Sequence, residues 1–400
     1  MRASLPVISA LVLAACTSAP SPKVQLSVVD PGHFHAALVQ KNPLEGVCDT
    51  VKVYAPEGPE VRQYLATVAS YGLPWVEETH LSEDFLEQLP PVSGPTEAVV
   101  LAGNNSSKSR YILEAVKKGY NVLSDKPMAL DTTDFSLLRE AYSLAAEKGT
   151  VILELMTERQ DPVNILTRNT IPRLGGMLEG DAQNPAIEME SIHHFYKEVS
   201  GAPLVRPVWY YDTSCQGEGI ADVTTHLIDL VFWQCFPDRA VSPADVQVVE
   251  ASHYPTFISP EQFFRSTRGQ AFPPGLRVSE DGLLPVYSNG SITFKVNGIF
   301  VKMAVRWDFE GEPDRFSAVY HCQDGDIRIL QEASTGYARK LFIRDADSTP
   351  APGPGHEDHF SLVTGTFLKA VTSEATLPAW EAENTLAKYK VTTTAVMMAQ

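Results

Sequence analysis

The sequence lacks the excess of basic residues that binding to nucleic acid requires. Its 400 residues include 32 lysines and arginines against 49 aspartates and glutamates, and the formal net charge is −17 at pH 7. No basic face is therefore available for a phosphate backbone, and we expect no nucleic-acid partner. Because an acidic surface also repels anionic lipid, any membrane contact has to come from an anchor.

The amino-terminal apolar run, residues 3–15, is too short to span a bilayer. It follows the basic start Met1-Arg2 and ends in Leu13-Ala14-Ala15-Cys16, ahead of a polar, proline-containing tether. This arrangement resembles a bacterial lipoprotein signal, in which the thiol of Cys16 receives the lipid. We therefore expect residues 1–22 to be a signal peptide and tether, and the protein to be exported and lipid-anchored to the cell envelope. An ordinary signal peptide with a chance cysteine, or an uncleaved leader, is the alternative.

Cysteine is scarce and is not spaced for metal binding. Apart from Cys16, the sequence has only Cys48, Cys215, Cys235 and Cys322. An exported protein could form disulfides, but the sequence selects no pairing, and buried free thiols are equally compatible with it. His356 and His359 have a helical i, i+3 spacing, yet no carboxylate–histidine pattern supports them as ligands. We expect no metal site.

What the sequence does contain is a globular composition, with 44% hydrophobic and 20% charged residues over a length typical of two domains. From residue 23 to residue 155, short apolar runs typical of buried strands alternate with helical stretches. The runs are 24–29, 51–54, 98–101, 121–124 and 151–155. The helical stretches 110–118 and 133–148 each end at a glycine suited to a C-cap. This alternation predicts a Rossmann-type dinucleotide-binding domain with a doubly wound parallel sheet over residues 23–155.

The pattern changes after about residue 156, where the strand-like runs are longer. They are 186–193, 246–251, 291–296, 299–306, 317–321 and 327–331, and Asn297-Gly298 is a strong hairpin signal. Two helices, 358–371 and 380–397, close the chain. Residues 156–400 are therefore expected to form a substrate and oligomerisation domain of α/β class, built on an open antiparallel sheet.

The turn after the first strand has few of the glycines that usually hold a dinucleotide pyrophosphate. It reads Asp30-Pro31-Gly32-His33-Phe34-His35, and of the three glycines of a G-x-G-x-x-G pattern only Gly32 is present. We interpret Gly32, His33, Phe34 and His35 as cofactor-binding, with an ordinary strand-to-helix turn as the alternative. The second strand ends in Tyr54-Ala55-Pro56-Glu57 without the expected acidic residue, so the pattern does not choose between NAD and NADP.

Two further motifs carry a resemblance to a known family. Ser124-Asp125-Lys126-Pro127 directly follows a strand, and residues 217–229 read GEGIADVTTHLID. Together with Asn104 they resemble the Gfo/Idh/MocA family, which includes glucose–fructose oxidoreductase and inositol dehydrogenase. The resemblance covers nearly the whole chain after the tether. It implies that Asn104, Asp125, Lys126 and Pro127 bind the cofactor, and that the catalytic residues are Lys126, Asp222 and His226.

The residue types suit that chemistry. An ammonium beside a reacting hydroxyl favours its alkoxide, and a neutral imidazole accepts a proton near neutral pH. On one helix Asp222, His226 and Asp229 would form a polar stripe, separate from an apolar stripe that packs in the core. The alternatives are a surface lysine in a turn and a hydrogen-bonded histidine on a capped helix.

Several polar and aromatic residues are candidates for the substrate pocket, because aromatic rings stack on sugar rings. The candidates are His193, His194, Tyr196, Tyr210 and Asp222, with Arg206, Trp209 and Tyr211 as weaker ones. Core packing is the alternative for all of the aromatic residues among them.

The resemblance implies an NAD(P)-dependent oxidoreductase that acts on a hydroxyl of a sugar, sugar derivative or cyclitol. Since little free NAD(P) is found outside the cytoplasm, we expect NAD or NADP to be tightly bound. One alternative is a glycoside-processing enzyme that oxidises, eliminates and reduces again with a retained NAD. Another is a non-catalytic surface lipoprotein that binds sugars. The family also implies oligomer contacts on the face of the carboxy-terminal sheet.

Overall fold

The structure, a computed structural model, describes residues 23–199 and 202–400. Its first sheet is entirely parallel, with the strand order β3-β2-β1-β4-β5-β6. The strands are β1 (Gln25–Val29), β2 (Thr50–Ala55), β3 (Val76–Leu81), β4 (Glu97–Leu101), β5 (Asn121–Ser124) and β6 (Ile152–Glu154). This order confirms the predicted doubly wound sheet.

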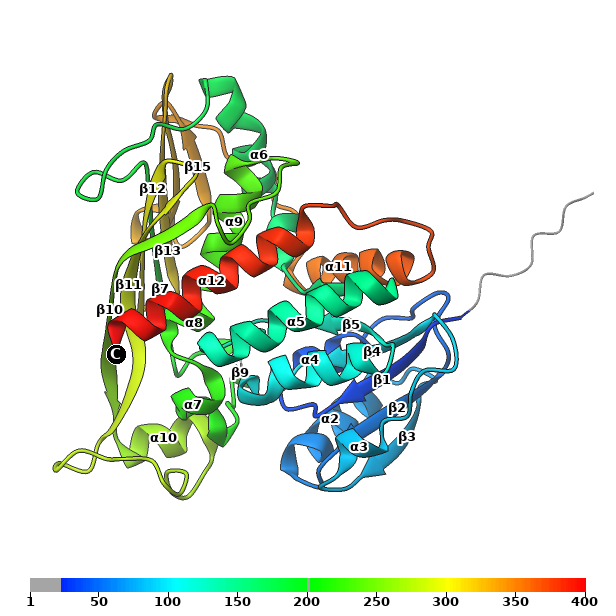
Figure 1. Ribbon diagram of the computed structural model, residues 1–400. Helices are drawn as coiled ribbons and strands as arrows, with labels where there is room; N and C mark the ends of the chain where they lie inside the picture. Colours follow the sequence, from blue (N-terminus) through cyan, green and yellow to red (C-terminus); the bar gives the residue numbers. More distant parts are fainter. Residues whose placement is uncertain (1–22, 200–201) are drawn as a thin grey trace, which may run out of the picture.

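Helices flank this sheet on both faces (Figure 1). They are α1 (His35–Leu38), α2 (Pro59–Ser70), α3 (Phe85–Gln88), α4 (Lys108–Lys117) and α5 (Thr132–Lys148). The sequence sets the ends of α5, because the Asp131 carboxylate accepts hydrogen bonds from the first-turn amides and Gly149 ends the helix with a left-handed φ of 69°. Helix α1 is much shorter than α5, with 4 residues against 17.

The second sheet has eight strands in the order β10-β11-β12-β7-β13-β14-β15-β16. They are β7 (Ile187–His194), β10 (Val246–Ile258), β11 (Leu284–Val296), β12 (Ile299–Asp308), β13 (Arg315–Cys322), β14 (Gly325–Gln331), β15 (Lys340–Ile343) and β16 (Ala346–Asp347). The Asn297-Gly298 turn joins β11 to β12 as predicted. The sheet is mixed rather than wholly antiparallel, because β7 pairs in parallel with β12.

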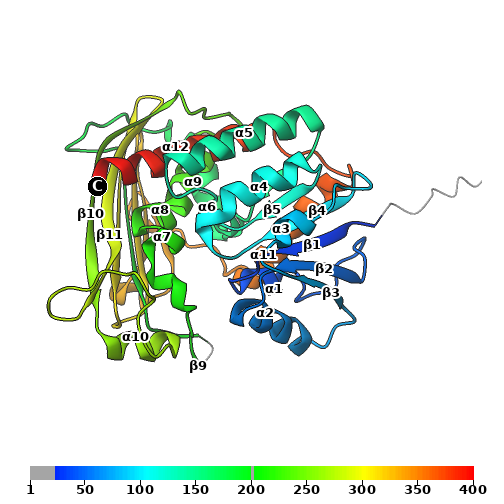
Figure 2. The same cartoon turned by 60° about the horizontal axis from the view of Figure 1, so that its bottom comes forward.

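Helices cover the face of the second sheet that looks toward the first domain, and the opposite face is open (Figures 1 and 2). The chain's remaining helices are α6 (Pro162–Thr170), α7 (Thr213–Gln216), α8 (Gly219–Asp222), α9 (Thr224–Cys235), α10 (Pro260–Thr267), α11 (His356–Val371) and α12 (Glu381–Ala399). The long helix α12 joins the two halves of the molecule, since it packs against α5, α9 and β10. Helix α11 instead returns to the first domain, where Phe360 and Phe367 lie in its core.

Some elements were not predicted, and one prediction is wrong. Strand β3 was missed because its sequence, VEETHL, lies at the exposed edge of the sheet and has no apolar run. The helix expected over the 217–229 motif is two helices, because α8 ends at Asp222 and α9 begins at Thr224. The predicted apolar stripe is nevertheless buried, from Ile220 to Val231.

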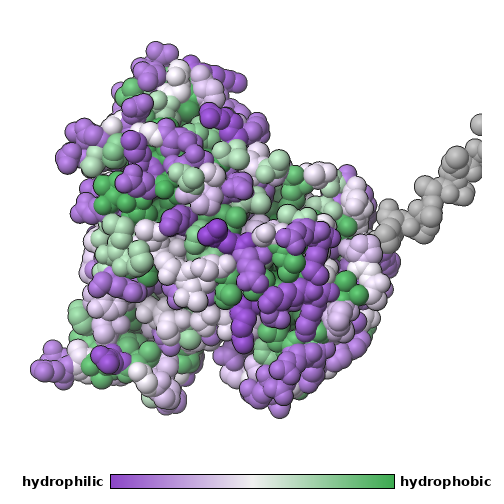
Figure 3. All heavy atoms as spheres, viewed as in Figure 1, coloured by the Kyte–Doolittle hydropathy of each residue, from purple (hydrophilic) through white to green (hydrophobic). Residues whose placement is uncertain are grey.

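Cys48, Cys215, Cys235 and Cys322 are all free thiols. In the part of the chain that the structure describes, no helix has the length and apolar character needed to cross a membrane. The face shown in Figure 3 mixes polar residues with small apolar patches. Cys16 and the predicted signal segment lie outside the described residues, so the anchor stays a prediction.

Candidate active site

Lys126 and Asp222, which are far apart in sequence, meet between the two domains. Lys126 lies just after β5, and its ammonium donates a hydrogen bond to the carboxylate of Asp222 at the end of α8. The same nitrogen lies 3.4 Å from the backbone oxygen of Asp222. Burial alone would raise the pKa of Asp222, but Lys126 lowers it below its ordinary value. The Asp222 carboxyl is therefore ionised at neutral pH.

His226 adds a proton acceptor beside this pair. Burial, together with the positive charge of Lys126, lowers the pKa of His226 to about 4. Its Nδ1 atom is buried and has no hydrogen-bond partner among the described residues. The imidazole is thus neutral at pH 7, which suits a base that has not yet taken its proton. The structure brings together the three residues predicted to be catalytic.

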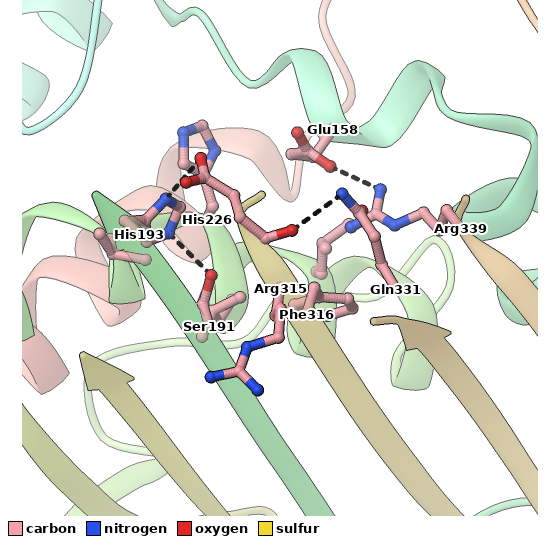
Figure 4. Close-up of a pocket in the computed structure, with 12 residues that line it drawn as sticks. Glu158, Ser191, His193, His226, Arg315, Phe316, Gln331 and Arg339 are labelled. Carbon is pink, nitrogen blue, oxygen red and sulfur yellow. Dashed lines mark hydrogen bonds and ion pairs between the residues drawn. The ribbon is translucent and has the colours of Figure 1, made fainter. Parts of the chain in front are cut away.

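A pocket with a cavity volume of about 230 Å³ opens beside His226. The pocket lies between α9 and the sheet strands β7, β13 and β14, and several of its residues are labelled in Figure 4. Its lining comprises Glu158, Ser191, His193, Val223, His226, Leu227, Leu230, Asp314, Arg315, Phe316, Gln331 and Arg339. One wall is apolar and comes from α9, and the others carry polar side chains.

Ion pairs and hydrogen bonds hold the polar wall in place (Figure 4). Arg339 donates to Glu158 over 3.0 Å. On the opposite side, His193 Nδ1 lies 3.5 Å from Asp314 Oδ2, and its Nε2 lies 2.8 Å from the Ser191 hydroxyl. Although burial opposes it, Arg339 lowers the pKa of Glu158 to about 2. The pocket therefore presents fixed donors and acceptors, which is what recognition of a small polyhydroxylated molecule needs.

The predicted substrate residues do not all reach this pocket. His193 lines it, whereas His194 lies behind it with Nδ1 3.2 Å from Asp314 Oδ1. Tyr210 is buried with its ring 4.4 Å from the guanidinium of Arg206, and Tyr196 stacks on Phe309. Neither tyrosine lines the pocket, and their contact with substrate stays a prediction.

Sequence reasoning missed Glu158, Asp314, Gln331 and Arg339, which come from separate loops and strands. None of them belongs to a motif that spacing could reveal. A weak signal existed for Ser191 alone, because it is two residues before His193 on one strand and must share its face.

Asp229 has a different role from the one its position in the motif suggested. Its carboxylate does not join His226 in the cleft but accepts hydrogen bonds from Arg159, at 2.6 and 2.7 Å, and from Lys388, at 3.0 Å. Arg159 also donates to Glu381, and Lys388 is paired with Glu154. This buried network joins the end of β6 to α9 and α12, so it holds the helix of His226 against the first domain.

The turn between β1 and α1 keeps the backbone path of a dinucleotide site but fills it with other side chains. Asp30 has a left-handed φ of 48°, a conformation in which aspartate is one of the few tolerated side chains besides glycine. A Cβ on Gly103 would lie 2.1 Å from the Asp30 backbone oxygen, so the close approach of the loops after β1 and β4 requires that glycine. Gly32 has more room, with Trp209 Cζ2 of the second domain 3.6 Å from the position of a Cβ.

Side chains crowd the same turn. The imidazoles of His33 and His35 have Nδ1 atoms 3.4 and 3.2 Å from Oδ2 of Asp125. Asn104 caps the short helix that follows, accepting from the Ser106 amide over 2.9 Å. The peptide bond between Lys126 and Pro127 is cis.

A dinucleotide fits this edge of the sheet. The turn into α1 lies at the carboxyl ends of the parallel strands, where this fold binds phosphates. Phe34 and His35 would hold the pyrophosphate through their backbone amides, and Lys126 would lie toward the reacting end. Pro56 directly follows β2, and the next residue, Glu57, is exposed to solvent, so the site does not choose between NAD and NADP.

Comparison with known proteins agrees with the fold. Residues 30–155 match a family described as "Oxidoreductase family, NAD-binding Rossmann fold" (GFO_IDH_MocA), and residues 166–353 and 351–400 match "Putative oxidoreductase C terminal domain". No curated protein matches the chain.

Solved structures extend the similarity over the whole chain. A putative oxidoreductase from Parabacteroides merdae is 36% identical, with 95% of this chain and 98% of that chain covered and a TM-score of 0.90. Two others share the fold. A putative myo-inositol dehydrogenase from Sinorhizobium meliloti is 14% identical, with 94% and 97% covered and a TM-score of 0.56. A 3-ketoreductase from Actinomadura kijaniata, solved with NADP and TDP-benzene, is 14% identical, with 94% and 98% covered and a TM-score of 0.62.

Proposed function

Because this chain belongs to the Gfo/Idh/MocA oxidoreductases and is an NAD(P)-dependent enzyme of that family, we propose that it acts on a hydroxyl of a sugar, sugar derivative or cyclitol. The observation that carries the proposal is that His226 borders both the Lys126–Asp222 ion pair and the polar pocket. A non-catalytic sugar-binding role is set aside, because the family is one of enzymes.

In the proposed reaction, His226, Lys126 and Asp222 each have a different role in proton transfer. In the oxidative direction the neutral imidazole of His226 takes the hydroxyl proton, and the ammonium of Lys126 stabilises the alkoxide that remains. Asp222 fixes Lys126 in place through their ion pair. When bound, NAD(P) supplies the acceptor for the hydride. In the reductive direction the same residues return the proton to the oxygen.

The pocket favours a substrate of about one sugar ring. Its volume of about 230 Å³ is below the range of roughly 300–1,000 Å³ that drug-sized ligands occupy. Hydroxyls both donate and accept hydrogen bonds, so they match a wall that alternates Asp314 and Glu158 with Arg339 and Gln331. The structural similarity to a putative myo-inositol dehydrogenase and to a 3-ketoreductase supports this class of substrate.

The decisive experiment is a screen of monosaccharides, amino sugars, sugar acids and cyclitols for reduction of NAD⁺ or NADP⁺. We expect turnover that His226→Ala lowers by about 10²- to 10⁴-fold, and that His321→Ala, on the exposed side of β13, leaves unchanged. Glycosides of the same sugars are tested in parallel, and product analysis by mass spectrometry separates a ketone from an eliminated aglycone, which would instead favour the glycoside-processing alternative. No turnover of any polyol by a protein that binds the dinucleotide would contradict the proposed substrate class.

Two properties of the mature protein are proposed with it. The first is tight retention of NAD(P), for which the absorbance and mass spectra of the purified protein are the test. The second is export and lipid anchoring at Cys16, in which case the protein expressed with its leader partitions into detergent and Cys16→Ser does not. Equal membrane association of the serine variant would refute the anchor.

A further inference from the structure

The β1–α1 turn brings three potential metal ligands to one point. His33, His35 and Asp125 each offer one ligand atom, and these three atoms lie within 4.8 Å of one another. The imidazoles come from one turn and the carboxylate from the loop after β5, so the parallel sheet places them together. The cluster lies outside the proton-transfer site formed by Lys126, Asp222 and His226.

Hydrogen bonding alone does not explain why the Nδ1 atoms of His33 and His35 both lie close to Asp125. Both Nδ1 atoms face the same oxygen of Asp125, and His35 makes the one hydrogen bond found there. Nδ1 of His33 is buried without a hydrogen-bond partner in the described chain. A buried polar atom left in this state is unusual, and an absent ion is one of the standard explanations.

The distances suit a small divalent ion. Ligands about 2.0–2.1 Å from a tetrahedral Zn²⁺ are about 3.3–3.4 Å apart. Both imidazole nitrogens, at 3.4 and 3.2 Å from Asp125 Oδ2, are close to that separation. An ion between them would replace an unsatisfied contact by three coordinate bonds.

The hydrogen bonds around Asp125 leave one of its two carboxylate oxygens available as a metal ligand. Lys108 is buried and donates to Oδ1 of Asp125, and also to Oδ1 of Asn105 over 2.7 Å. Oδ1 is therefore occupied and Oδ2 remains for the cluster. Metal-bound carboxylates are typically oriented by such outer hydrogen bonds.

We propose that His33, His35 and Asp125 bind one divalent transition-metal ion of the zinc class and leave its other coordination positions open. Two imidazoles and one carboxylate with an open position form a common donor set for such ions. The His33 side chain is 27% exposed, so an ion can enter from the solvent side. The proposal departs from the sequence-based expectation of no metal site.

The place of the site suggests what the open positions bind. In dinucleotide folds this turn faces the pyrophosphate, and phosphate oxygens are good ligands of divalent cations. The ion would supply the positive charge that a glycine-rich turn and a long helix provide elsewhere, where this chain has a helix of 4 residues. This consequence rests on the proposed NAD(P) function, whereas the metal site itself does not.

The test uses the untagged full chain, stripped with a chelator. Calorimetry with Zn²⁺ should show one ion per chain, and Co²⁺ should give visible absorption bands of a low-coordinate site. His33→Asn and His35→Asn should each weaken Zn²⁺ binding by more than the roughly 10- to 100-fold that loss of an outer partner costs. His321→Asn is the matched control, because its imidazole pairs with Asp326 at 2.9 Å on the surface and should keep wild-type affinity.

The outcomes separate the claims. Absence of saturable Zn²⁺ binding, or equal affinity in wild type and in a folded His33→Asn variant, overturns the metal site. Circular dichroism establishes folding, and His33 is the safer position because it is partly exposed. NADH affinity should rise when Zn²⁺ is present. Zn²⁺ binding with unchanged NADH affinity overturns only the link to the cofactor, whereas failure to bind NADH in both states counts against the proposed function alone.

Discussion

The cleft around His226 and the turn around Gly32 lie on either side of Lys126 and follow different rules. In the cleft, Lys126, Asp222 and His226 have the residue types expected for proton transfer beside a hydroxyl. In the turn, Asp30, His33 and His35 stand where flexible or small residues usually bind a pyrophosphate. The cleft has the side chains that the family motif leads one to expect, whereas the turn resembles a dinucleotide-binding turn only in its backbone path.

The difference follows from what each region has to do. Proton transfer needs a side chain with a given charge and pKa, which few residue types provide. A pyrophosphate is held largely by backbone amides, so side chains can vary as long as the chain follows the same course. Asp30 preserves that course with its left-handed φ of 48°, and Gly103 preserves the close approach of the neighbouring loop.

The largest expected effect is in the cleft. Lys126→Met and His226→Ala should each lower turnover by about 10²- to 10⁴-fold, the usual contribution of a general base, without loss of folding or cofactor binding. Because the proposed mechanism has both act on one hydroxyl, the double variant should be scarcely slower than the poorer single variant. If the losses in rate constant multiply in the double variant, Lys126 and His226 act independently. The cleft could then not be described as one proton-transfer site.

A second test asks what holds the cleft in place. Lys388 is fully buried between Glu154 and Asp229, so Lys388→Met leaves excess negative charge in the interior. Breaking a buried ion pair in this way typically costs about 3–5 kcal/mol in the free energy of unfolding. The exposed pair of Lys340 with Asp347 is the control, and Lys340→Met should cost at most about 1 kcal/mol. Chemical denaturation measures both, and equal losses would contradict a structural role for the buried network.

The third test compares two glycines of the turn. Gly103→Ala places a methyl group 2.1 Å from the Asp30 oxygen, and relief of that overlap should cost about 1–3 kcal/mol of stability and weaken dinucleotide binding. Gly32→Ala meets its nearest neighbour at 3.4 Å, so it should unfold at nearly the wild-type temperature. Gly32→Val is larger and should reduce NAD(P) affinity by steric exclusion. Thermal melts and cofactor titrations that ranked Gly32→Ala as the more damaging of the two alanine variants would reverse this assignment.

The smallest effect is a shift in the titration of His226. Its pKa of about 4 means that the imidazole stays neutral from pH 7 down to about pH 5 and gains a proton as the pH falls through 4. The charge of Lys126 helps to lower that pKa, so Lys126→Met should move it upward, toward 6.5. Histidine-selective NMR titration measures the shift directly. An unchanged or lower pKa in the variant would mean that Lys126 does not act on this imidazole.

Sequence periodicity predicted much of the fold where burial is regular. The buried strands β1, β4 and β5 each contain adjacent apolar residues, and α5 has recognisable signals at both ends. Strand β3 was not predicted, because an edge strand exposed to solvent needs no apolar pattern. The parallel pairing of β7 with β12 was equally invisible, because strand direction depends on the path of the intervening chain.

The sequence by itself determined the family and identified Lys126, Asp222 and His226 as the catalytic candidates, since they lie in recognisable motifs. Only the tertiary structure decided the pocket wall, the burial of Asp229 in an ion network, and the meeting of His33 and His35 with Asp125. The physical reason is distance along the chain. A sequence motif contains residues whose relative positions are fixed by one strand or helix. Glu158, Asp314 and Arg339, in contrast, become neighbours only when two sheets and the helices between them pack together.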